Sequence, residues 1–163
     1  MYDIVIRSLI SNDNLWLRDF LVTHWGSPWM VSRGRLFDVS THAGWVATNA
    51  AGEILGLITY DVLSPHNIEI TCLESRHESQ GIGTRLIETF LAHARTQAWP
   101  RVWLITTNDN VNALRFYQRR GFVLKALYPN AIEHARHLKP EIPLVGFHNI
   151  SIRDEIELEY NLA

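Results

Sequence analysis

The hydrophobic and polar positions near the start of the chain predict two elements of different kinds. Residues 3–9 are typical of a strand, and residues 13–25 predict a helix that begins behind the capping residues Asn12 and Asp13. The apolar face of this helix is formed by Trp16, Leu17, Phe20 and Leu21. The next segment, 26–37, follows neither period, so we expect it to be irregular.

The remainder of the chain predicts strands and helices in a mixed order. The predicted elements are a hairpin over 44–63 with its turn near Gly52, a strand at 67–74, a helix from 82 to 94, a strand at 101–107, a helix from 111 that closes at Gly121, a strand at 121–128, a helix at 130–139 stopped by Pro140, and a strand at 153–161. Asn108, Asp109 and Asn110 offer cap oxygens for the helix from 111. No internal repeat or linker divides this series, which indicates one folded unit.

Regular alternation assigns side chains to the faces of two of these strands. In strand 67–74 one face is predicted to carry Ile68, Ile70 and Cys72. Glu69 and Thr71 therefore point the other way. In strand 153–161 we expect the apolar residues to be buried and the glutamates between them to be solvated, where they would also protect a sheet edge. These glutamates are Glu155, Glu157 and Glu159.

Composition narrows the classes of function. A chain of 163 residues that is 47% hydrophobic and 20% charged suits a single domain over 1–163. A net charge of -2 without a long basic run argues against nucleic acid as a partner. No stretch approaches the roughly 18 apolar residues of a membrane span, and we expect a cytoplasmic location. The single cysteine, Cys72, excludes an internal disulfide and a cysteine-based structural zinc site.

The stretch ESQGIGTRLIETF, residues 78–90, places two glycines where a helical pattern begins. Without side chains, Gly81 and Gly83 would let backbone N–H groups and the positive helix end approach an anion. A dinucleotide fingerprint would need a third glycine at Leu86, and a P-loop would need Lys at Thr84. A tight turn that lets the helix pack against a strand explains the same glycines, so both interpretations stay open.

Two segments together carry a resemblance to a known family. QGIGTRLI at 80–87 and NVNALRFYQRRGF at 110–122, each after a predicted strand, resemble the GNAT superfamily of acetyl-CoA-dependent N-acyltransferases. The second segment has the family pattern NxxAxxFYxxxGF at Asn110, Ala113, Phe116, Tyr117, Gly121 and Phe122. The resemblance implies a single α/β (α+β) domain with a central mixed, mostly antiparallel twisted sheet of about seven strands, flanked by helices on both faces.

The same resemblance implies that acetyl-CoA is the cosubstrate and that no metal is needed. It assigns coenzyme binding to the loop residues Gln80, Gly81, Ile82, Gly83 and Thr84, to the backbone of Thr71, Cys72 and Leu73, and to Asn110 and Ala113. One position departs from the family pattern, because Glu78 stands where the pyrophosphate loop usually has Arg or Gln. A carboxylate there repels a diphosphate unless it points away, whereas the backbone N–H groups do not depend on residue type.

The implied reaction is direct attack of an amine on the thioester through a tetrahedral intermediate. A protonated amine cannot attack, so a base must accept its proton, and Glu69 is our candidate, with Glu74 as the alternative. The resemblance makes Tyr117 the proton donor to the leaving thiolate. A surface glutamate at Glu69 and a packing aromatic at Tyr117 are the structural alternatives.

Several other residues invite a functional role. Cys72 could be a nucleophile, but a buried cysteine usually acts as a small hydrophobe. His134 and His137 could share a helix face, yet a metal site needs a third ligand that the sequence does not identify. Trp25 and Trp29, with the nearby arginines, are candidates to line the acceptor pocket, although core packing explains them as well. These arginines are Arg33 and Arg35.

Two classes of function follow from the sequence. The first is an enzyme that transfers an acyl group, most simply acetyl, from coenzyme A to a small-molecule or protein amine. The second is a catalytically silent module that binds acyl-CoA. Release of free coenzyme A in the presence of an acceptor distinguishes them, because only the enzyme would produce it. The sequence does not identify the acceptor, because specificity resides in segments that match no motif. A homodimer is possible, and the sequence does not decide it.

Overall fold

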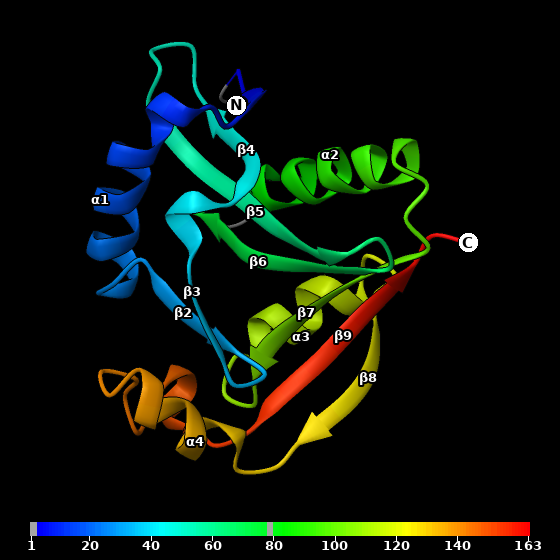
Figure 1. Ribbon diagram of the computed structural model, residues 1–163. Coiled ribbons are helices and arrows are strands. Elements are labelled where there is room, and N and C mark those ends of the chain that lie inside the picture. Colours follow the sequence, from blue (N-terminus) through cyan, green and yellow to red (C-terminus); the bar gives the residue numbers. More distant parts are fainter. Residues whose placement is uncertain (1–2, 78–79) are drawn as a thin grey trace.

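A twisted seven-stranded sheet organises the computed structural model, which describes residues 3–77 and 80–163 (Figure 1). The strands, in spatial order, are β1 (Val5–Ser8), β4 (Ala43–Thr48), β5 (Ile54–Ser64), β6 (Asn67–Ser75), β7 (Arg101–Thr107), β9 (Glu155–Asn161) and β8 (Val123–Tyr128). All neighbours pair antiparallel except β6 and β7, which are parallel. The predicted fold class, a mixed and mostly antiparallel sheet, is therefore confirmed.

Helices cover both faces of this sheet. The α-helices within the described residues are α1 (Asn14–Trp25), α2 (Ile82–Thr96), α3 (Val111–Gln118) and α4 (Ala131–Leu138). One buried cluster joins α2 and α3 to the sheet, with Phe90 and Phe122 among its fully buried side chains. A second cluster packs α1 on the opposite face, around Leu17, Leu21 and Leu57. The amphipathic patterns predicted for α1 and α2 thus face the core, as their spacing indicated.

Segment 26–37 contains regular strands, whereas the sequence predicted an irregular segment. It forms most of a two-stranded hairpin of β2 (Trp29–Ser32) and β3 (Arg35–Asp38), which pairs with itself and not with the large sheet. Its two-residue turn, Arg33–Gly34, has positive φ at both positions, +50° and +73°. Such turns match the twist of hairpin strands, but Arg is an unusual first residue in them, so the pattern carried no turn signal.

Strand β9 also differs from the prediction, because it lies inside the sheet between β7 and β8 and not at an edge. Its glutamates consequently meet protein groups, although Glu157 and Glu159 stay partly exposed. Glu155 is buried, and Glu159 forms ion pairs with Arg101 (2.6 Å) and Lys125 (3.2 Å). The helix cap at Asp13 is different as well: its carboxylate binds Arg7 at 2.7 Å and accepts the Ile10 N–H at 2.7 Å, but it makes no side-chain cap bond to α1.

The sheet opens between β6 and β7. These strands pair only at Ile68 with Val102 and at Glu69 with Trp103. Beyond this point the later residues of both strands line cavities instead of pairing with each other. No described helix is long and apolar enough to cross a membrane.

Candidate active site

A cleft of about 760 Å³ lies between the glycine loop and α3, and we call it the helix-side cleft. Gly81, Ile82, Gly83 and Thr84 line it from the start of α2. Gly81 has φ of +78°, which favours glycine. A Cβ on Gly83 would lie 3.3 Å from the Phe116 ring of α3, so this glycine permits close packing as well as an open backbone. The close packing is against α3 and not against a strand as predicted, and the open backbone remains compatible with anion binding.

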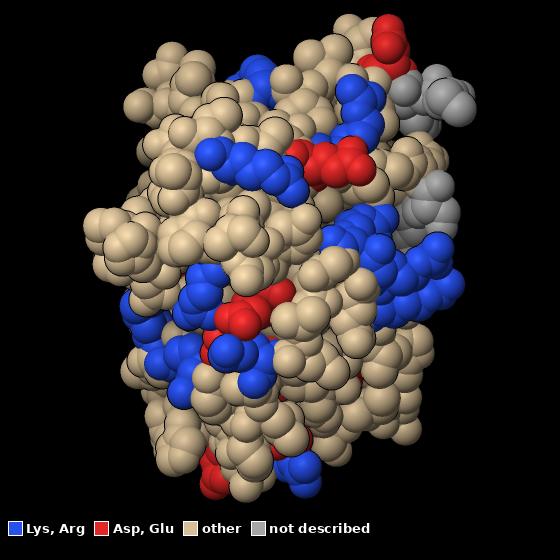
Figure 2. All heavy atoms as spheres, turned by 90° about the vertical axis from the view of Figure 1, so that its right-hand side faces the viewer, with Lys and Arg blue, Asp and Glu red and all other residues tan. Residues whose placement is uncertain are grey.

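Basic side chains enclose the other side of this cleft. Arg115, Arg119 and Arg120 line it from α3 and the turn after it. The Arg120 guanidinium lies over the Phe116 ring, 3.6 Å from its centroid, and donates a hydrogen bond to the Thr84 hydroxyl. Its Nε is buried and has no hydrogen-bond partner among the described residues. Lys and Arg side chains also gather at the right-hand edge of the surface drawn in Figure 2. The cleft suits an anionic ligand.

A second cavity, of about 610 Å³, lies on the opposite face of the sheet beneath the hairpin, and we call it the hairpin-side cavity. Its walls come from the end of α1, from β2 and β3, from the open stretch of β6 and β7, and from α4 and the segment that leads into β9. Leu73, Ala113 and Tyr117 line both cavities. A ligand that enters on the helix side can therefore meet a second ligand from the hairpin side.

A bulge at Thr71 shapes the open stretch of β6. Thr59 pairs with Cys72 and Tyr60 pairs with Ile70, so Thr71 has no partner on β5. The extra residue reverses the alternation, and Cys72 packs in the α1 cluster, on the face opposite Ile70. The prediction that Cys72 shares a face with Ile70 was wrong for this reason.

Polar contacts hold the bulge in place. The Thr71 hydroxyl lies 2.9 Å from the hydroxyl of Thr59 and 2.9 Å from Nδ1 of His42. The His42 ring stacks on Phe37, and burial lowers its pKa. A neutral imidazole can accept or donate at Nδ1, so it fits either orientation of the Thr71 hydroxyl.

Glu69 lies in the hairpin-side cavity and is 1% exposed. Its Oε2 accepts a 2.6 Å hydrogen bond from Arg35, whose guanidinium also binds Asp61 at 3.1 Å. Burial raises the pKa of Glu69, and the Arg35 charge opposes that rise. The alternative base, Glu74, does not line this cavity; burial raises its pKa too, and its polar neighbours are His24 and Trp25.

Tyr117 stands at the junction of the two cavities. Its ring packs edge-on against Phe116 and Phe122, at centroid distances of 5.2 and 5.3 Å. Burial raises the pKa of its hydroxyl, which therefore stays protonated near neutral pH. The residue is both a packing aromatic and a proton-bearing group at the junction.

The other predicted residues divide between these cavities and the surface. Thr71, Cys72 and Asn110 line the hairpin-side cavity, and Asn110 also caps α3 by accepting the Ala113 N–H at 3.1 Å. Gln80 is exposed and lines neither cavity, and Glu78 lies outside the described residues. Burial raises the pKa of Cys72, as expected of a packing thiol.

The expected acceptor residues are only partly in place. Trp25 lines the hairpin-side cavity, whereas Trp29 does not and instead offers its backbone oxygen to Lys139 at 2.8 Å. His134 and His137 are exposed on α4. Over residues 3–77 and 80–163 no cluster of His, Cys, Asp and Glu could hold a metal ion.

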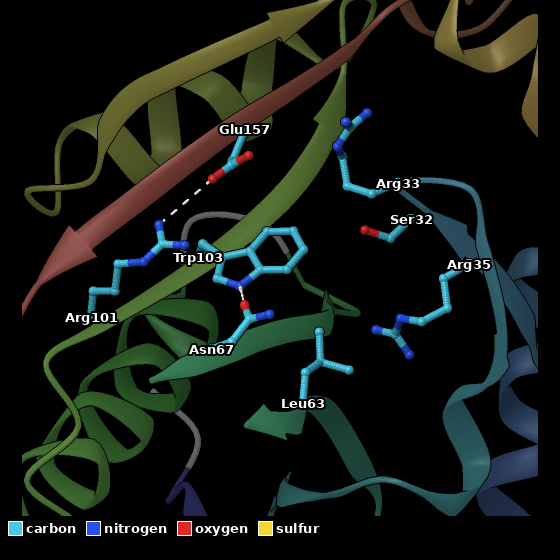
Figure 3. Close-up of a pocket in the computed structure, with 8 residues that line it drawn as sticks. All are labelled: Ser32, Arg33, Arg35, Leu63, Asn67, Arg101, Trp103 and Glu157. Carbon is cyan, nitrogen blue, oxygen red and sulfur yellow. Dashed lines mark hydrogen bonds and ion pairs between the residues drawn. The ribbon is translucent and has the colours of Figure 1, made fainter. Parts of the chain in front are cut away.

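The nearby arginines border a separate, smaller cleft of about 310 Å³ (Figure 3). Arg33, Arg35 and Arg101 surround Trp103, whose indole N–H donates to Asn67 at 2.7 Å. Each arginine already faces a carboxylate: Arg33 faces Glu155, Arg35 faces Glu69 and Asp61, and Arg101 faces Glu157 and Glu159. These pairs leave the cleft little charge with which to bind an anion.

The sequence analysis did not predict two buried carboxylates in the hairpin-side cavity. Asp109, predicted only as a possible cap, and Glu155, predicted to be solvated, are each 1% exposed and line the cavity. Acidic residues after one strand and at the start of another gave no signal that they would meet. Only the pairing of Thr107 with Glu155 brings them to the same end of the sheet.

Comparison with known proteins agrees with this architecture. The chain is similar to the uncharacterized protein YdhI of Bacillus subtilis (strain 168), at 47% identity over 140 residues that cover 86% of this chain and 87% of YdhI. In fold it is similar to a GNAT family acetyltransferase from Elizabethkingia anophelis with acetyl-CoA bound, with a TM-score of 0.69, 19% identity, and 98% and 99% of the two chains covered.

A second solved structure of similar fold is Arabidopsis thaliana Naa50 in complex with the bisubstrate analogue CoA-Ac-MVNAL, with a TM-score of 0.70 and 17% identity over 98% of this chain and 99% of that one. The sequence also matches the acetyltransferase (GNAT) family over residues 13–122, which include the glycine loop, the opened strands and α3. This protein therefore belongs to the GNAT family of acetyltransferases.

Proposed function

We propose that the protein is an N-acetyltransferase that moves an acetyl group from acetyl-CoA to an amine by direct attack. The observation that carries this proposal is the opening between β6 and β7, where Leu73, Ala113 and Tyr117 line both cavities. A basic cleft with a glycine loop lies on one side, and a cavity with a buried carboxylate lies on the other. Two substrates can meet there without crossing the sheet.

The helix-side cleft fits the anionic end of acetyl-CoA. Backbone N–H groups at the start of α2 and the arginines of α3 together suit a pyrophosphate. On β6, the stretch after Glu69 has no pairing with β7, so its N–H and C=O groups on that side are available to the pantetheine arm. Backbone N–H groups of Cys72 or Leu73 would stabilise the oxyanion of the tetrahedral intermediate.

Glu69 is the proposed base. It lies in the hairpin-side cavity, and its raised pKa makes it a better proton acceptor than an ordinary glutamate. The amine gives its proton to Glu69 directly or through a water, and the lone pair then attacks the thioester carbon. Arg35 holds the carboxylate in one orientation throughout, through its 2.6 Å hydrogen bond.

Tyr117 is the proposed acid. Collapse of the intermediate breaks the carbon–sulfur bond and leaves the electron pair on sulfur, which the protonated hydroxyl of Tyr117 can neutralise. Its place at the junction suits this role, because a donor there can reach a thioester that enters from the helix side.

The test is release of free coenzyme A from acetyl-CoA with a panel of primary amines. We expect amine-dependent release that falls sharply when Glu69 or Tyr117 is changed. Binding of acetyl-CoA without release by any amine would instead indicate a catalytically silent acyl-CoA-binding module. No melting shift with millimolar acetyl-CoA would overturn both functions, since a ligand at about 100 times its Kd stabilises a fold by roughly 2.7 kcal/mol.

A further inference from the structure

The hairpin-side cavity contains more buried carboxylates than one general base requires. Glu69, Asp109 and Glu155 all line it and are each 1% exposed. Among the described residues, Lys139 is the Lys or Arg side chain that lines it; its Nζ donates to the Trp29 carbonyl at 2.8 Å, and burial lowers its pKa. Buried carboxylates are costly unless a donor or a positive charge meets them.

Asp109 is held in one orientation with half of its carboxylate unused. Its Oδ2 accepts the Phe147 N–H at 3.0 Å. A Cβ on Gly146 would lie 2.0 Å from that oxygen, so the glycine lets the backbone approach. The other oxygen, Oδ1, is buried and finds no hydrogen-bond partner within the described part of the chain. A fixed, buried carboxyl oxygen without a partner, on a residue that lines the cavity, suits a ligand that brings a donor.

Glu155 is only loosely satisfied. Its contacts with Arg33 are long, 3.3 Å from the backbone N–H and 3.5 Å from the guanidinium. That guanidinium also lies over the Tyr128 ring, 3.2 Å from its centroid. Arg33 therefore divides its interactions between a ring and a carboxylate, and Glu155 can accept a further hydrogen bond.

Strand register separates these carboxylates from the proposed base. Glu69 pairs with Trp103, and Glu155 pairs with Thr107. Glu155 therefore lies four residues further along β7, or about 13 Å at the usual rise of a strand. Asp109 follows two residues after Thr107. Apolar side chains such as Met30, Phe37 and Ile105 also line the cavity.

We propose that the acceptor is an elongated amine with a second positive group, an ammonium or guanidinium, which Asp109 and Glu155 bind while the reacting amine lies beside Glu69. This inference rests on the proposed acetyl transfer. A cation would satisfy the free oxygen of Asp109 and the loosely held Glu155 together, and an aliphatic linker would contact the apolar wall between the two ends.

The test compares three acceptors with the same carbon chain: diaminooctane, octylamine, and the amino alcohol in which a hydroxyl replaces one ammonium. With acetyl-CoA and the whole chain, kcat/KM for diaminooctane should exceed that for octylamine by about tenfold or more, as expected for one charge-assisted hydrogen bond in a buried site. The amino alcohol should behave like octylamine. Equal values for diaminooctane and octylamine, or an amino alcohol as good as the diamine, would overturn the proposal.

Variants assign the effect to the two carboxylates. Asp109→Asn and Glu155→Gln should each lower the ratio of kcat/KM for diaminooctane to that for octylamine by several-fold, whereas Glu133→Gln, an exposed change on α4, should leave the ratio as in the wild type. A ratio unchanged in both carboxylate variants contradicts the assignment. Melting temperatures identify a variant that fails to fold, in which case the other variant decides.

Measuring the binding of the acceptors directly tests this inference independently of the proposed function. If neither octyl compound is acetylated, calorimetry with the coenzyme A complex compares their affinities. Tighter binding of the diamine supports the second site, and equal or absent binding overturns it. Failure of the proposed function is a different result: no free coenzyme A with any amine of a broad panel.

Discussion

The two cavities of this protein are built in different ways. The helix-side cleft is formed largely by two short stretches, the glycine loop at the start of α2 and the segment 112–120 on and after α3. The hairpin-side cavity is assembled from side chains scattered between His24 and Glu155 along the chain. The cleft offers backbone groups and arginines, whereas the cavity offers buried carboxylates, so we expect changes in the first to affect coenzyme affinity and changes in the second to affect chemistry.

Removal of the proposed base should have the largest effect. Glu69→Gln keeps the shape of the side chain but cannot accept the amine proton, so turnover should fall by about a hundredfold or more while acetyl-CoA affinity changes little. Steady-state kinetics with a competent amine measures the loss. Glu74→Gln is the matched control, because Glu74 does not line the hairpin-side cavity. A wild-type rate in Glu69→Gln would exclude Glu69 as the base.

Tyr117 tests whether the junction belongs to the chemistry or only to the packing. Tyr117→Phe removes the hydroxyl and keeps the ring contacts with Phe116 and Phe122. Turnover should fall by about ten- to a thousandfold with little change in melting temperature. Near-normal turnover combined with destabilisation of about 1 kcal/mol would mean that the hydroxyl has a structural role instead.

A change in the glycine loop should affect coenzyme binding and not the chemical step. In Gly83→Leu the new side chain meets Phe116 and projects into the helix-side cleft. The stabilisation by acetyl-CoA, roughly 2.7 kcal/mol at about 100 times its Kd, should disappear while the unliganded protein stays folded. Thermal melts with and without acetyl-CoA measure this. Ala92→Leu, at an exposed site on the same helix, is the control and should retain the shift.

The smallest expected effect concerns the pH dependence of the rate. Burial raises the pKa of Glu69 and the Arg35 guanidinium lowers it, so Arg35→Met should raise the pKa further. Since the base must be deprotonated, the acidic limb of the kcat/KM profile should move to higher pH. Arg101→Met is the control, because Arg101 borders the same small cleft but pairs with Glu157 and Glu159. If the acidic limb of the kcat/KM profile does not move in Arg35→Met, the group that titrates in this limb is not Glu69.

Local signals predicted the elements that form the helix-side cleft. Asn110 caps α3 at the predicted position, and Gly121, with φ of +89°, lies in the turn that follows that helix. The apolar face of α2 is buried as its periodicity indicated. Caps, periodic faces and positive-φ glycines depend on residues within a few positions of one another, and the family motif lies in the same short stretches.

The hairpin-side cavity is formed by contacts between residues that are far apart in the sequence, so local signals did not predict it. The sequence by itself determined the order of strands and helices outside segment 26–37, the glycine loop, and the presence of Glu69 and Tyr117 on elements that can meet. Only the tertiary structure decided that Thr71 bulges and turns Cys72 to the other face, that β9 lies inside the sheet, and that Arg35 reaches Glu69. Strand order, bulges and burial arise from packing between segments far apart in the chain, and a local pattern of residues does not encode such packing.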